Sequence, residues 1–247
     1  MNRFTASAYL VFLLSSAIFA QEKDASFTVF GSFLAPLGDY GFERGQNAGL
    51  TRRFGFDIGE DAGLSGPGVG LGLEFRTPVL TNGLEWVVSL QGLTNSVKTT
   101  ELTRFFREEL GDSTDVLFET GSWFHIPLLT GLRYSYDLVG NARIFASLEG
   151  GVNVTREAPR TVKVNGAVVE ETSFRFMPDF GYQATIGVTL FGNYELMVRY
   201  LDLGTPRYEG TRVLNEQFFS TIPRRGNAIS GDPRPVKILL IAVGYTL

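Results

Sequence analysis

The only histidine of the chain, His125, is the residue best suited to acid–base chemistry near neutral pH. A histidine that hydrolyses or transfers acyl groups needs a serine or aspartate partner within hydrogen-bond distance. Ile126 and Pro127 follow His125 directly, and nothing marks the nearby Ser122 as a nucleophile. We therefore interpret His125 as part of an interior polar network, and we predict no catalytic residue.

The sequence gives little support for a metal site or for a phosphate-binding loop. The chain has no cysteine and no second histidine, so a metal site would depend on carboxylates alone. Residues 57–66, DIGEDAGLSG, lack the spacing and the closing glutamate of an EF-hand loop. An alternating segment, not a helix, follows the glycines of 66–72, GPGVGLG, which argues against a phosphate loop. We interpret Gly68, Gly70 and Gly72 as space for bulky interior neighbours, and we predict no metal and no cofactor.

The segment that carries His125 alternates with a period of two, which is typical of a β-strand. One face of residues 123–136 is apolar and aromatic, whereas His125 shares the other face with Arg133. The alternation recurs in several further segments, less cleanly in the first and the sixth of them: 25–36, 68–79, 84–93, 142–155, 174–191, 194–203 and 236–247. The sequence therefore predicts about eight strands, most of them near the length of about 9–11 residues that a tilted membrane strand requires.

Composition limits the class of protein. The 247 residues include 29 glycines and 13% aromatic residues, which favours a β-rich fold. The formal net charge of −4 gives no general attraction to nucleic acid, and we expect no nucleic-acid partner. Residues 1–20 resemble a secretory signal peptide cleaved after Ala20; a membrane anchor is the alternative, but the apolar run is short of the roughly 20 residues needed. We predict that residues 21–247 form one barrel domain, since no linker divides them. No later stretch is apolar for long enough to form a membrane helix, so a membrane location would require strands.

The connections between these strands alternate in length. The short ones are LTNG, DLVGN and FGN, and the first contains the Asn-Gly pair of a tight hairpin. The long ones cover about 37–67, 95–121, 155–173 and 204–235. Long and short connections at opposite rims are typical of an antiparallel up-and-down transmembrane β-barrel with periplasmic turns and extracellular loops. This arrangement predicts that both ends of the barrel domain lie on the periplasmic side.

The same alternation also fits a soluble barrel with its apolar face inside. The polar face is, however, rich in small residues and has no lysine in mid-strand, which suits a crowded interior. Aromatic residues also gather near the strand ends of the apolar face, as in the girdles of membrane barrels. Predicted girdle members are Trp86, Tyr134, Tyr136, Tyr194 and Tyr245 at the short-turn rim, and Phe124, Phe174 and Phe176 at the long-loop rim. We therefore expect the apolar face to meet lipid.

Two stretches carry a family resemblance. WFHIPLLTGLRYSY is similar to a strand motif of small outer-membrane β-barrel proteins of the OmpX/PorT-like group: an aromatic residue, a short gap, Ile-Pro-Leu-Leu and an aromatic-rich end. The terminal AVGYTL resembles the C-terminal strand that the barrel-assembly machinery reads, although it ends in Leu247 instead of phenylalanine. The resemblance covers residues 25–247. It implies a barrel in a bacterial outer membrane, surrounded by lipid and lipopolysaccharide, and it leaves the function open.

Charged and polar residues of both signs are predicted to face the interior and to pair with one another. They are Glu74, Arg76, Glu85, Gln91, His125, Arg133, Arg143, Glu149, Arg175, Asp179 and Arg199. Such a network would fill an eight-stranded barrel, whose interior is only wide enough for side chains. The most favoured function is thus a non-enzymatic scaffold that presents its loops to an extracellular ligand or protein, or that protects the surface. The alternatives are a narrow channel for small solutes and, less favoured, a lipid-modifying enzyme.

Three long connections contain patterns of their own. Residues 100–110 have the apolar spacing of a short helix. NGAVVEE, residues 165–171, carries an Asn-Gly pair and predicts a hairpin above the membrane. NEQFFSTIPRRGN, residues 215–227, combines aromatic residues with two arginines, a mixture found equally in binding surfaces and in loops that fold back onto a barrel mouth.

Overall fold

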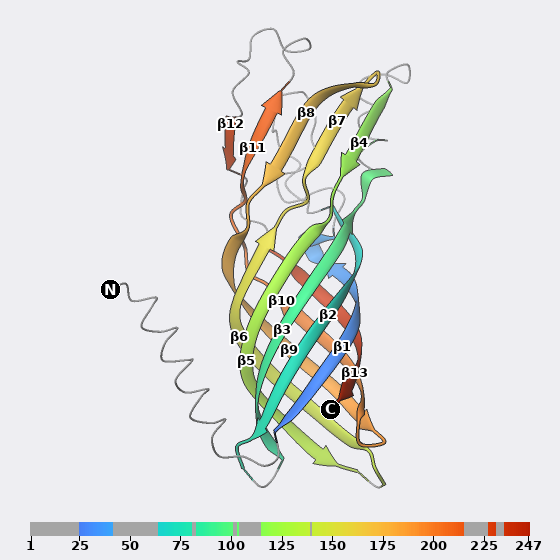
Figure 1. The fold of residues 1–247 in the computed structure, drawn as a ribbon, viewed down its shortest axis with the longest axis vertical. Coiled ribbons are helices and arrows are strands. Elements are labelled where there is room, and N and C mark those ends of the chain that lie inside the picture. Colours follow the sequence, from blue (N-terminus) through green and yellow to red (C-terminus); the bar gives the residue numbers. More distant parts are fainter. Residues whose placement is uncertain are drawn as a thin grey trace, which may run out of the picture.

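The computed structural model forms a closed barrel that continues, on one side, into a second sheet (Figure 1). It describes residues 25–41, 64–80, 83–100, 103, 115–138, 140–214, 227–230 and 235–247. The barrel strands are β1 (Ser26–Leu37), β2 (Ser65–Pro78), β3 (Leu84–Val97), β5 (Trp123–Asp137), β6 (Arg143–Arg156), β9 (Met177–Leu190), β10 (Tyr194–Asp202) and β13 (Lys237–Thr246). The prediction of an all-β, antiparallel, up-and-down barrel of eight strands is confirmed.

Closure of the barrel depends on β1, which pairs with β2 on one side and with β13 on the other. Thr28 lies opposite both Glu74 of β2 and Thr246 of β13, so the first and last described strands of the barrel are neighbours. Closure removes the free sheet edges that would otherwise expose unpaired backbone groups to lipid. The first and last strands begin and end at the rim of the short turns, as the alternation of connection lengths predicts.

The outer face of the barrel is apolar. Alternate residues of every barrel strand point outward, and the outward ones include Leu71, Leu148 and Phe180, whose exposed fractions are 72%, 66% and 65%. A protein in water rarely leaves so many large apolar side chains exposed on adjacent strands. The apolar face therefore lies outside, as expected of a barrel in lipid. Among the described residues, no helix has the length and hydropathy to cross a membrane.

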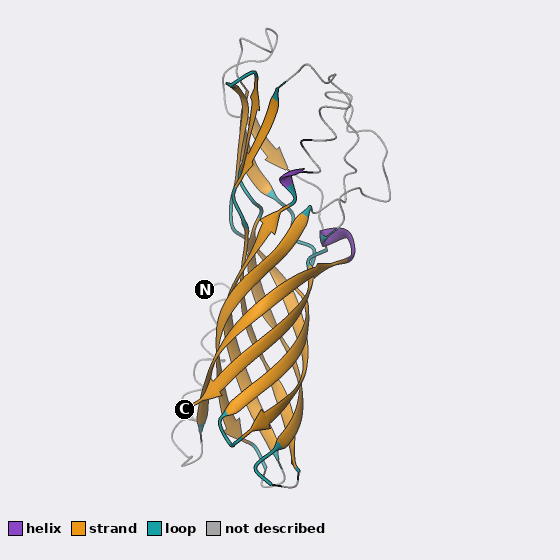
Figure 2. Ribbon diagram, turned by 90° about the vertical axis from the view of Figure 1, so that its right-hand side faces the viewer, coloured by secondary structure: helices purple, strands orange, loops and turns teal. Residues whose placement is uncertain are grey.

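The second sheet stands on the long-loop rim and is called the rim sheet below (Figure 2). It contains β4 (Val116–Thr120), β7 (Arg160–Val164), β8 (Ala167–Phe174), β11 (Glu209–Leu214) and β12 (Asn227–Ser230), in the order β12-β11-β8-β7-β4. This order repeats that of the barrel strands β13-β10-β9-β6-β5, since each rim strand adjoins one barrel strand along the chain. Five of the eight barrel strands therefore have a continuation beyond the barrel.

The sequence predicted only one part of the rim sheet, the hairpin of β7 and β8. Its turn is the Asn165–Gly166 pair, and both residues have positive φ values, 50° and 79°, as a tight hairpin turn of this kind requires. The other rim strands are four to six residues long and follow breaks in the alternation, so they resembled loops. A short 3-10 helix, η1 (Gly38–Tyr40), follows β1 and carries a tyrosine into the barrel mouth.

Several sequence predictions fall outside the described residues. They concern the signal peptide at 1–20, most of the segment considered for calcium at 57–66, most of the helix predicted at 100–110 and the aromatic loop at 215–226. Of the predicted helix, the structure assigns helical conformation to Thr100 and Thr103.

Candidate functional site in the barrel interior and the rim sheet

The short-turn end of the interior holds a cluster of buried ion pairs around Glu195. Arg76 Nη1 donates to Glu195 Oε1 at 2.7 Å, and Arg133 Nη2 donates to the same oxygen at 3.0 Å. Arg76 also donates to Thr28 Oγ1 at 2.6 Å and to Thr246 Oγ1 at 2.9 Å, so it connects both sides of the closing seam. Both guanidinium groups are buried, and their planar forks allow them to contact several acceptors at once.

A second carboxylate, Glu74, joins this cluster to the middle of the barrel. It accepts hydrogen bonds from Arg133 Nη1 at 3.1 Å and from Arg199 Nη2 at 2.7 Å. Aromatic rings cover the two arginines: the Arg133 guanidinium lies 3.4 Å from the Phe145 ring centre, and that of Arg199 lies 4.1 Å from the Phe30 ring centre. Buried charge is costly without pairing, and here salt bridges and cation–π contacts provide it.

A third carboxylate, Glu149, is bound by uncharged groups. It accepts hydrogen bonds from Ser89 Oγ at 2.6 Å, Ser147 Oγ at 2.9 Å and Gln183 Nε2 at 2.9 Å. Gln91 Nε2 donates in turn to Gln183 Oε1 at 2.7 Å. Polar side chains from β3, β6 and β9 thus span the middle of the lumen.

His125 lies near the long-loop end of the interior and is fully buried. Its Nε2 lies 2.7 Å from the Tyr40 hydroxyl, and its Nδ1 lies 2.9 Å from Thr155 Oγ1. Burial raises the pKa of the Tyr40 hydroxyl, which therefore stays protonated and can donate to His125. The Trp123 ring stacks at 6.3 Å from the imidazole. The His125 ring is buried and each of its nitrogens takes part in a hydrogen bond, so the ring connects Tyr40 to Thr155 as a structural element.

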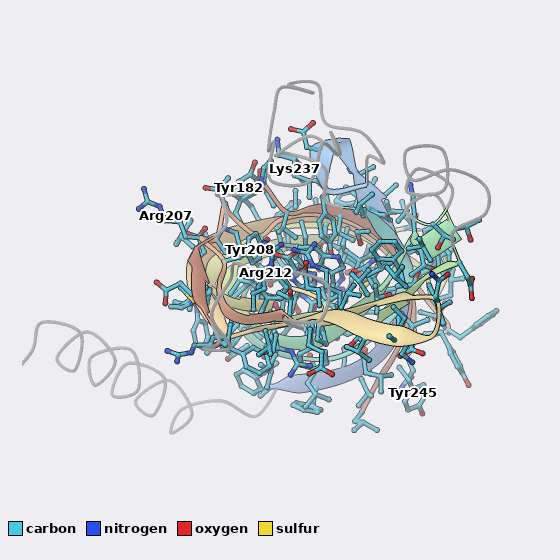
Figure 3. The ribbon with its side chains drawn as sticks, turned by 90° about the horizontal axis from the view of Figure 1, so that it is seen from above. Tyr182, Arg207, Tyr208, Arg212, Lys237 and Tyr245 are labelled. Carbon is cyan, nitrogen blue, oxygen red and sulfur yellow. The ribbon has the colours of Figure 1, made fainter. Side chains whose placement is uncertain are left out.

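An apolar cluster closes the interior above His125. Its members come from barrel strands, from η1 and from the connections to the rim sheet: Leu34, Tyr40, Leu93, Trp123, Ala158, Leu201, Leu203, Tyr208, Val236, Ile238 and Leu240. Tyr208 lies over the lumen in the view from above (Figure 3). The interior therefore has polar layers below and an apolar layer at the mouth.

The structure brings most of the predicted interior residues together. Those buried in the barrel interior are Glu74, Arg76, Gln91, His125, Arg133, Glu149 and Arg199, and Glu85 lies at the edge of the ion-pair cluster, 3.4 Å from Arg133 Nε. Three predicted members lie elsewhere. Arg143 is exposed and pairs with Asp137 at the short-turn rim, because it is the first residue of β6 and has no barrel wall beyond it.

The other two corrections concern the junction with the rim sheet. Arg175 is exposed because it lies in the two-residue connection between β8 and β9, where the alternation reverses. Asp179 lies near the long-loop end of β9, where it accepts hydrogen bonds from the backbone N–H groups of Phe180 at 2.8 Å and Thr205 at 2.6 Å. It therefore fixes the connection after β10 and takes no part in the network.

Sequence reasoning missed two important residues. Glu195 shares the inward face of β10 with Arg199, so the alternation of 194–202 contained the signal, but that strand was among the less regular ones. Tyr40 lies outside any strand, and only the return of η1 over the barrel mouth brings it to His125. Among the described residues, no group of three or more histidine, cysteine or acidic side chains could hold a metal ion.

The rim sheet has an inner face with a core of its own. Leu64, Val116 and Phe118 are buried together there, with Val162 and Val164 against them. On the same face, Arg212 Nε donates to Glu170 Oε1 at 3.0 Å, and Thr172 Oγ1 donates to it at 2.8 Å. Leu64 directly precedes β2, so these contacts fasten the rim sheet to the opposite side of the barrel.

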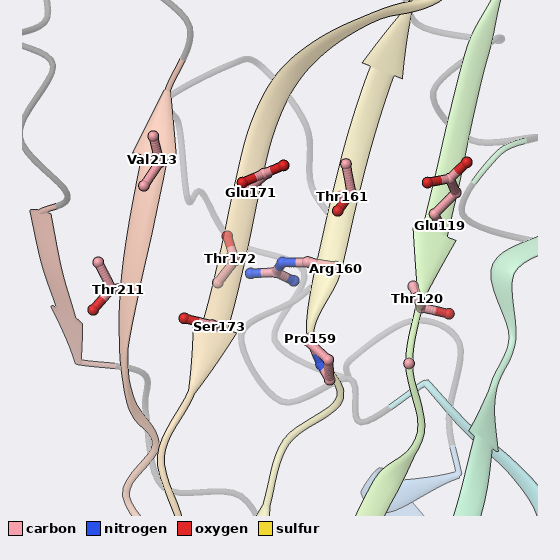
Figure 4. Close-up of a pocket in the computed structure, with 11 residues that line it drawn as sticks. Glu119, Thr120, Pro159, Arg160, Thr161, Glu171, Thr172, Ser173, Thr211 and Val213 are labelled. Carbon is pink, nitrogen blue, oxygen red and sulfur yellow. The ribbon is translucent and has the colours of Figure 1, made fainter.

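The rim sheet also bears an open polar cleft of about 460 Å³ (Figure 4). Glu119, Thr161, Glu171 and Val213 line it from four adjacent strands, and their registered pairing places them on one face. The remaining lining residues are Thr120, Gly121, Pro159, Arg160, Thr172, Ser173 and Thr211. Carboxylates, hydroxyls and one guanidinium thus surround a space large enough for a small polar ligand.

Comparisons with known proteins give only distant similarities. No protein-family model matches the chain, and no curated protein does. Among solved structures, a major outer membrane protein from Thermus thermophilus is similar with a TM-score of 0.48 and 11% identity, over 91% of this chain and 100% of that one. The outer membrane protein OprG from Pseudomonas aeruginosa has a TM-score of 0.44 and 13% identity over 92% and 97%. Neisserial surface protein A has a TM-score of 0.41 and 11% identity over 90% and 96%.

The strand register and the distribution of side chains define the architecture. Eight antiparallel strands close on themselves, their outer faces are apolar and their inner faces carry paired charges. The chain therefore folds as a small eight-stranded β-barrel of the outer-membrane type.

Proposed function

We propose that this protein is a non-enzymatic scaffold of the bacterial outer membrane that holds the rim sheet on the extracellular side for contact with a ligand or a protein. The observation that carries this proposal is the continuation of five barrel strands into an ordered sheet. That sheet has its own core and an open polar cleft, so it offers a surface of fixed shape. The proposal includes a signal peptide at residues 1–20, insertion by the barrel-assembly machinery and surroundings of lipid and lipopolysaccharide.

The packing of the interior supports a scaffold over a channel. Ion pairs join opposite walls of the barrel, as Arg76 of β2 and Glu195 of β10 do, and the apolar cluster lies across the mouth. A continuous path for water would have to cross both the ion pairs and the apolar cluster. The burial of His125 between Tyr40 and Thr155 also argues against catalysis, because a substrate cannot reach a ring that is fully enclosed.

Conductance of purified, folded protein in a planar bilayer tests the scaffold against the channel. We expect silence or rare small openings from the wild-type protein. Glu195→Gln, which replaces the carboxylate shared by two arginines with a neutral amide, should increase the frequency of openings, whereas Glu85→Gln at the edge of the network should not. Steady openings of porin size in the wild-type protein would support the channel and refute the scaffold.

Orientation is tested by labelling, since the chain has no cysteine of its own. Val213→Cys places a thiol on the exposed face of the rim sheet, and Leu138→Cys places one in the turn between β5 and β6. A maleimide that cannot cross membranes should label the first on intact cells and the second only after the outer membrane is opened. The opposite pattern would reverse the assigned orientation.

A further inference from the structure

The two ends of the lipid-facing surface differ in how their arginines are neutralised. On β6 the outward apolar column runs from Ile144 to Val154, ten residue steps that rise about 25 Å on a strand with a tilt of about 40°. That rise equals the height of the apolar band of an outer-membrane barrel. Arg143 and Arg156 therefore flank the band, one at each end.

Arg143, at the short-turn end, pairs with Asp137 at 2.6 Å. Arg156 is the next outward residue above Val154, and its guanidinium carbon lies 4.9 Å from the Phe176 ring centre. Its Nε has no hydrogen-bond partner among the described residues. Phe176 and Phe124 meet edge to face at 6.2 Å, so Arg156 lies on an aromatic patch at the upper edge of the band. Arg143 is thus neutralised by a carboxylate of the protein, whereas Arg156, among the described residues, is not.

Two further arginines lie on the neighbouring connections at the same level. Arg175 occupies the connection between β8 and β9, and Arg207 occupies that between β10 and β11; both are exposed. The backbone N–H of Arg175 donates to the carbonyl of Glu209 at 2.9 Å, which places these two connections side by side. Seen from above, Arg207 extends away from the barrel (Figure 3).

The nearby carboxylates do not neutralise this arc of Arg156, Arg175 and Arg207. Within the described part of the chain, none of the three forms an ion pair with a carboxylate. Asp179 is bound by backbone N–H groups, and Asp202 lies 3.9 Å from Lys237. Glu171 and Glu209 are exposed, and neither forms an ion pair with these three arginines among the described residues.

We propose that Arg156, Arg175 and Arg207 form a binding site for the phosphate groups of anionic glycolipid headgroups in the outer leaflet. The planar fork of arginine matches the oxygens of a phosphate, and a guanidinium at the level of the headgroups can reach it without leaving the aromatic patch. The lipid source follows from position, because the arc borders the apolar band where acyl chains meet headgroups. The inference rests on the proposed membrane location and names the lipid chemistry that fits there.

The test is a titration of bisphosphorylated lipid A into the protein in zwitterionic micelles, with bound lipid counted by native mass spectrometry. The combined variant Arg156→Gln, Arg175→Gln and Arg207→Gln should bind on the order of a hundredfold more weakly than the wild type, if each arginine contributes as a cation near an anionic surface does. Arg143→Gln, at the opposite rim, is the matched control and should bind as the wild type does. Equal affinity of the combined variant and the wild type would overturn the proposal.

Two further arms identify the ligand. Dephosphorylated lipid A should bind the wild type as weakly as the bisphosphorylated form binds the combined variant. Inorganic phosphate should not compete at concentrations that match the lipid; equal competition would make the arc a site for free phosphate and overturn the assignment to lipid.

Failure of this inference is separable from failure of the proposed function. Insertion into neutral phosphatidylcholine vesicles is measured by flotation and by heat-modifiable gel mobility. A protein that inserts but shows no preference for phosphorylated lipid refutes the arginine arc alone. A protein that never enters vesicles refutes the membrane location and with it both proposals.

Discussion

Removal of the Glu195 carboxylate is the most informative perturbation of the interior. Glu195→Gln leaves Arg76 and Arg133 buried beside a neutral amide in place of the carboxylate that both contact, at 2.7 and 3.0 Å. Breaking a buried ion pair by removal of one partner costs about 3–5 kcal/mol of unfolding free energy. Both arginines keep other contacts, Arg133 with Glu74 at 3.1 Å and Arg76 with Thr28 at 2.6 Å, so we expect the lower end, about 3 kcal/mol.

Glu85→Gln is the matched control, since it removes a carboxylate from the same network at its edge. The Glu85 side chain is 15% exposed and lies 3.4 Å from a single nitrogen of Arg133. A partly hydrated pair of this kind should contribute less than about 1 kcal/mol. A third variant combines Glu195→Gln with Arg76→Gln and should recover part of the loss, because it removes one of the two unpaired cations.

The assay is reversible unfolding by guanidinium in lipid vesicles, followed by the fluorescence of Trp86 and Trp123 and by heat-modifiable gel mobility. The expected order of stability is wild type, Glu85→Gln, the double variant and Glu195→Gln. If Glu195→Gln were no less stable than Glu85→Gln, the ion-pair cluster would not hold the short-turn end of the barrel together, and the reasoning would be refuted.

Three further outcomes are expected. Leu148→Arg, in the middle of the lipid-facing band, should lower the free energy of unfolding in vesicles by about 2–4 kcal/mol, and Leu138→Arg in a turn should not; equal effects would contradict the assignment of the outer face. Gly72→Ala should destabilise by about 1–3 kcal/mol because its methyl group meets the Phe30 ring, whereas Gly92→Ala meets no atom within 4 Å and should be neutral by the same unfolding assay. His125→Asn should fold but lose about 1–3 kcal/mol, since it disturbs the hydrogen bonds to Tyr40 and Thr155; a hydrolase activity that this change abolished would show His125 to be catalytic instead.

The barrel was predictable because its signals are local. A period of two survives in each barrel strand, since every strand separates lipid from a crowded interior, and Leu71 or Leu148 on the outside alternates with Glu74 or Glu149 on the inside. The spacing of the turns then gave the number of strands and the rim at which each connection lies. The glycines of β2 carried a similar signal, because Gly70 and Gly72 leave room for Leu93, Ser32 and Phe30 on neighbouring strands.

The rim sheet was only partly predictable. The Asn165–Gly166 pair marked one hairpin, because that turn needs positive φ at both central residues. The other rim strands have no comparable local mark. They are ordered by pairing with strands far away in the chain, as β11 is with β8, and such pairing depends on where the barrel strands have already placed the connections.

By itself, the sequence determined the alternation, and with it the barrel, its strand order along the chain and most of the charges that face inward. It did not determine which of those charges meet. Glu195 and Arg76 are 119 residues apart, and only closure of β1 onto β13 sets the shear that brings them to 2.7 Å. The tertiary structure likewise decided that Arg143 and Arg175 lie outside the network and that Tyr40 returns to His125. Alternation assigns a side chain to a face, whereas the ends of strands, the reversal of a connection and the height of a contact in the barrel depend on how neighbouring strands are staggered.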